Sequence, residues 1–276
     1  MEPFLLKKSK FIIEKWQSKT GLVAGFTCKN SIKEHEHNKN QNLGLHVGDL
    51  HQNVVDNRLF IAKEIGIPLQ KWVGSQQTHG CQIKKISQND AGLGSEFYEE
   101  AIKDTDGLYT DAPGILLTQF YADCVPVFFR HKNSRMIGIA HAGWKGTTLG
   151  IAGEMIRIWQ EEEGIQPSEV EAIIGPSICK MCYQVDEKVI KAIEKLLGHA
   201  VSQVYTSKDS IHYFLDLKKT NELVLLKNGV LSENIYKTNF CTKCDEDYFF
   251  SHRREQGNAG RMMGYIGWLE SNESIG

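Results

Sequence analysis

The stretch ILLTQFYADCVPVFFRHKNSRMIGIA, residues 115–140, decides the fold class of this 276-residue chain. Residues 115–121, 125–130 and 136–140 are apolar runs rich in β-branched and aromatic side chains, a pattern typical of buried β-strands. The polar residues 131–134 (HKNS) between the last two runs predict a hairpin turn. The stretch therefore predicts strands of a buried β-sheet, two of them joined in a hairpin.

Strands and helices follow on both sides of this stretch without strict alternation. Further strand-like runs cover residues 21–28, 71–77, 82–87, 170–174 and 265–269. Helical patterns cover residues 53–65, residues 147–163, the segment from Asp186 to Gly198 and the segment from Asp216 to Gly229. Because the strands cluster instead of alternating one by one with helices, the sequence predicts an α+β fold with mixed β-sheets.

Two of these helices carry specific expectations. The first should bury one apolar stripe and end at Gly66, with the stripe formed by Val54, Val55, Leu59, Ala62 and Ile65. The helix at residues 147–163 should begin with threonine caps at Thr147 and Thr148. The unpatterned segments 33–41 and 88–104 are expected to be loops.

Composition excludes several classes of protein. Hydrophobic residues make up 41% and charged residues 24%, a balance typical of globular proteins and not of disordered, collagen-like or coiled-coil chains. The 32 basic and 34 acidic residues give a net charge of −2, which argues against a nucleic-acid partner. Without repeats or a linker-like segment, residues 1–276 are expected to form a single domain.

The cysteines point to a reducing compartment. No apolar run is long enough for a transmembrane helix, and the first residues do not fit a signal peptide, so we expect a cytoplasmic protein without a membrane partner. The seven cysteines should then be reduced, and they are better considered as thiolates or metal ligands than as disulfides.

Three side chains at strand ends form the first candidate site. His79 closes an apolar strand, His141 directly follows another, and Cys124 lies between them in a β-like stretch. Two imidazoles and one thiolate suit zinc, and three protein ligands leave a fourth position for water or substrate. The remaining histidines, including His35 and His37, are expected to have surface or structural roles.

The two CxxC pairs, Cys179/Cys182 and Cys241/Cys244, are a competing metal site. Two such pairs can form a structural zinc site, but the long separation from Cys182 to Cys241 favours incidental reduced cysteines. A separate feature is the predicted helix start, where Lys145 and the amides of Thr147 and Thr148 could bind an anion; an ordinary capped helix is the simpler interpretation.

Motifs along nearly the whole chain together resemble one family. In order, they are NLGLHVGD (42–49), NR (57–58), QTHG (77–80), DGL (106–108), ADCVP (122–126), HAGWKG (141–146), IGPSI (174–178), CYQV (182–185), FFSHRR (249–254) and GR (260–261). This set and order are similar to those of the polyphenol oxidase or laccase-domain family, which includes bacterial purine nucleoside phosphorylases.

The resemblance implies a fold, an activity and a metal. The implied fold is a sandwich of mixed β-sheets with outer helices, and the implied metal ligands are His79, Cys124 and His141. The implied activity is zinc-dependent phosphorolysis of adenosine and inosine, with S-methyl-5′-thioadenosine as a further candidate substrate and adenosine deamination as a second activity. Copper is a possible ion, but a four-copper laccase needs many clustered imidazoles, and the one His-x-His here lies in a polar loop.

Residue roles follow from this hypothesis. His46, Arg58 and Lys145 are candidate groups for phosphate, Asn42 could contact ribose or base, and Asp123 could transfer protons or hold a turn. In deamination, zinc would lower the pKa of water and so activate it. The chain departs from the family at two positions, Tyr121 instead of threonine and Lys145 instead of arginine, which puts anion affinity in doubt.

Two alternatives stay open. The first is a hydrolase acting on an amide or cell-wall precursor, with Cys124 as nucleophile and His79 or His141 as base. Zinc binding and nucleophilic attack exclude each other at Cys124, since a coordinated thiolate attacks poorly. The second is a non-enzyme, either a structural zinc protein using the CxxC pairs or a partner-binding domain. The sequence leaves the oligomeric state undetermined.

Overall fold

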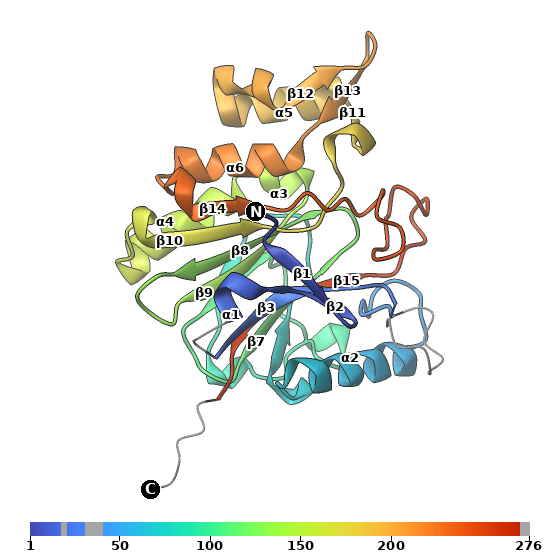
Figure 1. Ribbon diagram of the computed structural model, residues 1–276, viewed down its shortest axis with the longest axis vertical. Coiled ribbons are helices and arrows are strands. Elements are labelled where there is room, and N and C mark those ends of the chain that lie inside the picture. The colour runs from blue at the N-terminus through green and yellow to red at the C-terminus, as the bar shows by residue number, and fades with distance from the viewer. Residues whose placement is uncertain (18–20, 31–40, 271–276) are drawn as a thin grey trace, which may run out of the picture.

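The computed structural model describes residues 1–17, 21–30 and 41–270, and two six-stranded β-sheets form its centre (Figure 1). The strands of the first sheet are, in spatial order, β1 (Phe4–Lys7), β2 (Lys10–Ile13), β3 (Leu22–Thr27), β15 (Met262–Trp268), β7 (Leu116–Tyr121) and β4 (Trp72–Gly74). Those of the second are β14 (Ile235–Lys237), β10 (Val170–Ile174), β8 (Val125–His131), β9 (Ile137–Ala142), β6 (Gly107–Thr110) and β5 (Ile83–Lys85).

Both sheets are mixed. In the first, neighbouring strands are antiparallel except for the parallel pair β4 and β7. In the second, β5 pairs parallel with β6 and β14 pairs parallel with β10, while the other neighbours are antiparallel. The predicted hairpin is confirmed, since β8 and β9 pair on either side of residues 132–136. The α+β prediction is confirmed with it.

The two sheets pack face to face, and the second sheet is covered on both faces. Phe128 and Ile139 point toward the first sheet, where they meet side chains such as Phe26 in one buried cluster. Their neighbours Val127 and Phe129 point the other way, toward the helices. Burial on both faces explains why these strands appear in the sequence as continuous apolar runs instead of alternating ones.

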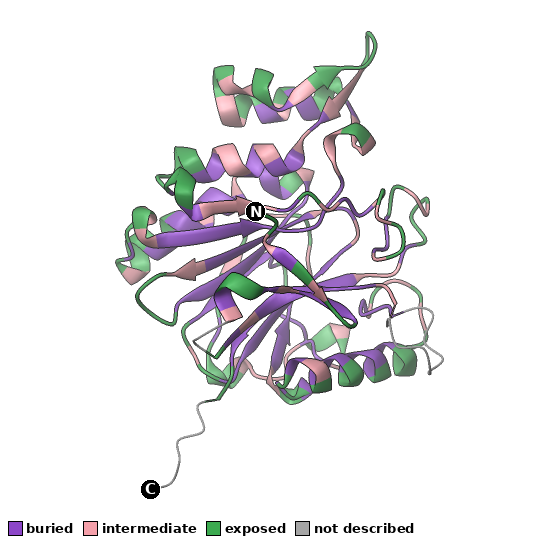
Figure 2. Ribbon diagram, in the orientation of Figure 1, coloured by how far each residue is buried: buried purple, intermediate pink, exposed green. Residues whose placement is uncertain are grey.

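Helices cover the outer faces, which gives the sandwich implied by the family resemblance. The α-helices are α1 (Glu14–Gln17), α2 (His51–Ile65), α3 (Trp144–Thr148), α4 (Ile151–Glu163), α5 (Glu187–Leu197) and α6 (Leu217–Lys227). Helices α4 and α6 pack over the second sheet, α5 packs against α3 and α6, and α2 packs over the first sheet. Figure 2 shows the resulting pattern, with buried strands at the centre and exposed residues on the outer helices.

A small third sheet lies beside α5 at the far end of the molecule (Figure 1). Its strands are, in spatial order, β11 (Gln184–Asp186), β13 (His212–Leu215) and β12 (Tyr205–Ser207). The described residues also form short 3-10 helices at Leu69–Lys71, Gln88–Asp90, Tyr98–Glu100, Pro167–Glu169, Lys180–Cys182, Gly198–Gln203 and Ser232–Asn234. Two of these lie within the predicted loop 88–104.

The helix predicted at residues 147–163 is two helices, and its threonine caps are wrong. Helix α3 begins at Trp144, and α4 follows after Gly150, which has a left-handed φ of 80°. Neither helix has a side-chain cap. The amide of Thr147 already donates to the Gly143 carbonyl, so it is unavailable to an anion. Neither Trp144 nor Lys145 is a typical cap residue, so the sequence carries no clear signal for the start of α3 at Trp144.

Helix α2 buries four of the five residues of the predicted stripe, and Leu59 is the exception. It spans His51–Ile65 and ends, as predicted, at Gly66 in a left-handed conformation. Leu59 is 46% exposed, while the charged Arg58 is only 1% exposed. The buried face also includes Asn57, Arg58 and Ile61, and the Arg58 guanidinium is satisfied there by backbone carbonyls.

Residues 33–40 of the other predicted loop, including His35 and His37, lie outside the described residues. Within the described residues, no helix is both long enough and apolar enough to cross a membrane.

Candidate metal centre and substrate pocket

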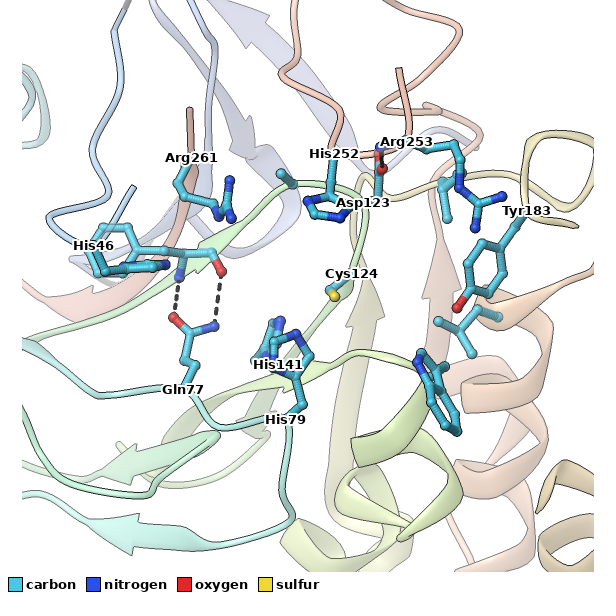
Figure 3. Close-up of a pocket in the computed structure, with 15 residues that line it drawn as sticks. His46, Gln77, His79, Asp123, Cys124, His141, Tyr183, His252, Arg253 and Arg261 are labelled. Atoms are coloured by element: carbon cyan, nitrogen blue, oxygen red, sulfur yellow. Dashed lines mark hydrogen bonds between the residues drawn. The ribbon is translucent and has the colours of Figure 1, made fainter. Parts of the chain in front are cut away.

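Three side chains from separate segments meet where the two sheets come together (Figure 3). His79 lies in the loop after β4, Cys124 in the turn that leads from β7 in the first sheet to β8 in the second, and His141 in β9. One ligand atom from each lies within 4.8 Å of the other two. The structure thus brings together the three residues that the sequence singled out as metal ligands.

The donor set fits a metal ion. Two imidazoles and a thiolate suit zinc or copper, and three protein donors leave a position for a further ligand. The floor of the cluster is Gly143, where an added Cβ would lie 3.0 Å from Cys124 Sγ and 3.1 Å from His79 Cδ2. Glycine at this position therefore leaves the space in which the three donors converge.

Asp106 organises the cluster, and it has no role in the sequence-based hypothesis. Its carboxylate, which is 0% exposed, accepts hydrogen bonds from the amides of Thr78, His79 and Gly80. Its Oδ1 also lies 2.8 Å from Nδ1 of His141, which leaves Nε2 of that ring for a metal. Such carboxylate–histidine contacts fix the tautomer and orientation of metal-binding imidazoles.

The amide contacts of Asp106 also hold the backbone of His79 in an unusual conformation. His79 has a φ of 61°, in the left-handed region that few residues other than glycine adopt. Such conformations cost free energy and persist only where surrounding contacts hold them. Asp106 supplies these contacts, so one carboxylate positions both imidazoles.

Charge interactions within the cluster favour a thiolate. Burial alone would raise the pKa of Cys124, but the charge of His141 and hydrogen bonds from His141 and His79 lower it to about 6. Burial likewise acts to lower the pKa of His141, yet the charge of Cys124 and the hydrogen bond to Asp106 raise it to about 9. The lowered pKa of Cys124 suits metal binding, which requires a thiolate.

Asp123 has a structural position next to the cluster. Its carboxylate accepts hydrogen bonds from Thr242 Oγ1, Ser251 Oγ and the Arg253 amide. Its φ of 86° turns the backbone sharply just before Cys124. Asp123 therefore ties the β7–β8 turn to the C-terminal segment.

The cluster lies in a cavity of about 380 Å³, within the usual range of small-molecule sites. The residues that line it are His46, Gln77, His79, Phe120, Ala122, Asp123, Cys124, His141, Trp144, Ile178, Tyr183, Leu217, His252, Arg253 and Arg261. Figure 3 shows Arg261 and His46 on one side and Arg253 and Tyr183 on the other. Both sides of the cavity thus carry an arginine, and the side with Tyr183 is the aromatic one.

Of the four predicted substrate residues, His46 alone lines this cavity. Burial, reinforced by the charges of Arg261 and Arg58, lowers the pKa of His46 to about 4, so its ring is neutral at pH 7. Lys145 is exposed on α3, with its Nζ 5.9 Å from the ring centre of Trp144. Tyr121, the other departure from the family motif, is buried beside His141.

Asn42 and Arg58 form hydrogen bonds with the backbone of loops behind the cavity. The side chain of Asn42 accepts from the amides of Gly44 and Arg261. The guanidinium of Arg58 donates to the carbonyls of Leu43, Gly94 and Ser95. Neither side chain reaches the cavity, so both act on the site through the loops they hold.

Sequence reasoning gave no role to the cations that line the cavity. Arg253 and Arg261 come from the long segment between β14 and β15, within motifs that were noted but not interpreted. Their signal was a group of charged residues in a segment without strand or helix periodicity, a pattern that is more often functional than structural.

Comparisons with known proteins agree with this fold and show the family. The family model described as multi-copper polyphenol oxidoreductase laccase matches residues 23–269. A protein named purine nucleoside phosphorylase YlmD from Geobacillus stearothermophilus is 42% identical over 250 residues, 91% of each chain. A Bacillus subtilis protein with the same name is 42% identical over 275 residues, 98% of each chain.

Solved structures match over almost the full length. The Bacillus licheniformis hypothetical protein YfiH has a TM-score of 0.92 at 40% identity, covering 97% of this chain and 100% of that one. YlmD from Geobacillus stearothermophilus also has a TM-score of 0.92, at 39% identity, covering 98% of this chain and 100% of that one.

The role of Arg58 can be tested by its effect on stability. In Arg58→Met, three buried carbonyls lose their donors, and each unsatisfied group costs about 1–3 kcal/mol. We expect the unfolding free energy to fall by roughly 3 kcal/mol or more, measured as a lower urea midpoint. The control Arg157→Met, on the exposed face of α4, should leave the midpoint unchanged. Unchanged stability with a raised KM for phosphate would instead make Arg58 a substrate ligand.

The role of Asp106 can be tested through metal affinity. In Asp106→Asn, the new side-chain NH2 would face one of the N–H groups from which the carboxylate now accepts a hydrogen bond. We expect metal affinity to fall about 10–100-fold, the usual effect of losing such a carboxylate, measured by competition with a chelator. Unchanged affinity would contradict the assigned role.

The same variant has a pH signature. Burial acts to raise the pKa of Asp106, but the hydrogen bond and charge of His141 and the amides lower it overall. The ionised carboxylate therefore stabilises the metal-free protein above the unfolded-state pKa, and this stabilisation is lost as the pH falls through the lowered folded-state pKa. Asp106→Asn should lack this component of acid unfolding.

Proposed function

The chain belongs to the multi-copper polyphenol oxidoreductase laccase family, and from this premise we propose that it is a zinc-dependent purine nucleoside phosphorylase. The observation that carries the proposal is a cluster of two histidines and one cysteine in a cavity that also has arginines and aromatic side chains. The relatives named purine nucleoside phosphorylase support it. We also propose that the protein works in the cytoplasm, where its thiols stay reduced.

His79, Cys124 and His141 would hold the ion, and zinc is the proposed occupant. A bound zinc ion would act as a Lewis acid and lower the pKa of a water molecule at this site. A four-copper oxidase requires many more imidazoles than the two in this cluster. We therefore propose the phosphorylase activity named for the relatives, and not the multi-copper oxidase activity in the family's description.

Phosphorolysis needs an anion site on one side of the sugar. A phosphate oxygen attacks C1′ while the C1′–N9 bond breaks, and the electron pair of that bond leaves with the purine. Arg261 offers a guanidinium suited to phosphate, and neutral His46 offers an N–H donor beside it. We assign phosphate to this side, where fixed charge positions the nucleophile and stabilises the developing transition state.

The aromatic side suits the purine. Tyr183 and Trp144 offer flat apolar surface, and Arg253 lies over the Tyr183 ring at 5.4 Å while donating to the Gln184 carbonyl. Burial raises the pKa of Tyr183, so its hydroxyl stays protonated and can donate to the departing base. Asp123 is assigned a positioning role because its carboxylate already accepts three hydrogen bonds.

Adenosine deamination is proposed as a second activity of the same cavity. It requires a purine held beside an activated water, and the three protein donors of the cluster leave a position for such a ligand. Adenosine, inosine and S-methyl-5′-thioadenosine are the proposed nucleoside substrates of phosphorolysis.

A cysteine hydrolase is the second candidate function, and one observation favours it. Cys124, His141 and Asp106 form a nucleophile–base–orienter series, with the pKa of Cys124 lowered to about 6. Stoichiometric metal that slows alkylation of Cys124 would favour the phosphorylase. A trapped acyl-enzyme at Cys124 would favour the hydrolase.

The first activity test follows the products. Zinc-loaded protein with adenosine and phosphate should form adenine and ribose 1-phosphate, with inosine from deamination; adenine should require phosphate. Cys124→Ala should lose metal and at least about 100-fold in activity, since the lost Lewis acid is worth several kcal/mol. Zinc-loaded protein that yields none of the three products would refute the proposal.

The second activity test separates the two ends of the cavity. Hydrogen bonds to charged groups contribute about 1.5–3 kcal/mol, so Arg261→Gln should raise the KM for phosphate about 10–100-fold. Deamination, which uses no phosphate, should change much less. The exposed Arg135→Gln is the matched control and should alter neither activity. Equal loss of both activities would mean that Arg261 has a structural role instead.

A further inference from the structure

The four cysteines of the two CxxC pairs converge, although the sequence favoured unrelated thiols. Cys179 and Cys182 lie after β10, and Cys241 and Cys244 lie after β14. Each Sγ lies within 4.8 Å of the other three, and the Cys182 and Cys244 sulfurs are 3.3 Å apart. The two pairs are far apart in sequence, but the fold brings them together because β10 and β14 are parallel neighbours whose ends meet at one edge.

Backbone contacts hold the two pairs together. Ser177 and Cys241 form a parallel β-bridge, and the Thr242 amide donates to the Ser177 carbonyl. The amides of Cys179 and Cys244 both point at Cys241 Sγ, at 3.2 and 3.4 Å. Amide donors directed at a sulfur stabilise negative charge on it, which a metal-bound thiolate carries.

We propose that Cys179, Cys182, Cys241 and Cys244 bind a structural zinc ion, separate from the His79 cluster. Zinc–sulfur bonds of about 2.3 Å in a tetrahedron place the sulfurs about 3.8 Å apart, close to the present spacing. The set is complete with four thiolates and has no open position, which is typical of structural sites. Nothing in this proposal depends on phosphorolysis.

Charge near the cluster also suits this occupant. Zinc with four thiolates carries a net charge of −2, and such a charge needs compensation when partly buried. The buried ammonium of Lys218 donates to the carbonyls of Thr238 and Phe240, directly before Cys241. It therefore lies where it can offset that charge.

A disulfide is the competing state. One disulfide between Cys182 and Cys244 would use two sulfurs and leave Cys179 and Cys241 without a cation. Two CxxC turns that present all four sulfurs to one point are what a tetrahedral ion requires, whereas disulfides require only separate pairs.

The cluster is placed to hold one wall of the cavity. Residues 238–261 contain no helix or strand, yet they carry His252 and Arg253 to the cavity. Thr242, between two of the cysteines, donates to Asp123, next to Cys124. Arg254 donates to the carbonyls of Thr242 and Lys243. Zinc would therefore fix the start of a segment that has no regular secondary structure.

The test is a metal count on the full chain, purified under reducing conditions with zinc supplied. Wild type should hold two zinc ions per chain. Cys124→Ala should hold one, and so should the double variant Cys179→Ser/Cys244→Ser. The control Cys28→Ala, at a buried cysteine outside both clusters, should hold two. The double variant should also be cut faster by protease within residues 238–261.

If the double variant fails to fold, a spectroscopic measurement on the Cys124→Ala protein tests the proposal instead. Cobalt bound to the Cys124→Ala protein can receive four thiolates at the proposed site alone, and it should show thiolate-to-cobalt charge transfer and the intense visible bands of a tetrahedral centre. A Cys124→Ala protein without zinc, no such bands, or a Cys182–Cys244 disulfide in place of the ion would overturn the proposal. Absence of phosphorolysis would not affect it.

Discussion

The site depends on one buried carboxylate. Asp106 binds the amides of the His79 turn on one side and the His141 ring on the other, and its own backbone pairs with both segments through Gln82 and His141. It thereby joins a loop that follows a strand of the first sheet to a strand of the second. This contact holds the left-handed turn at His79, and two hydrogen bonds between Gln77 and the Phe120 backbone hold the residues just before it.

The cavity forms because the chain changes sheet at the site. The turn from β7 to β8 passes between the two sheets within residues 122–124, and it carries Asp123 and Cys124 to their meeting point. Asp123 then binds the C-terminal segment, which supplies Arg253 to the cavity. The candidate metal ligands, Arg253 and the proposed four-cysteine zinc site are consequently parts of one connected arrangement, in which local backbone strain is held by hydrogen bonds from distant segments.

Errors in the sequence-based predictions share a cause. Arg58 was assigned to substrate because its charge suggested an anion, yet three backbone carbonyls satisfy it inside the protein. The helix at residues 147–163 was predicted as one because its apolar pattern is continuous across Gly150. In both cases the local pattern was insufficient, because the partners of Arg58 lie elsewhere in the fold and a left-handed Gly150 separates two helices within one apolar pattern.

The sequence by itself determined eight of the fifteen described strands, the hairpin and the α+β class, because apolar periodicity reflects which faces must be buried. It also identified His79, Cys124 and His141, since their residue types at strand ends already suit a metal. Tertiary structure alone decided that Asp106 orients the imidazoles, that Arg253 and Arg261 line the cavity, and that two distant CxxC pairs meet. These features depend on distances between segments, which are set when the sheets pack and have no counterpart in local sequence.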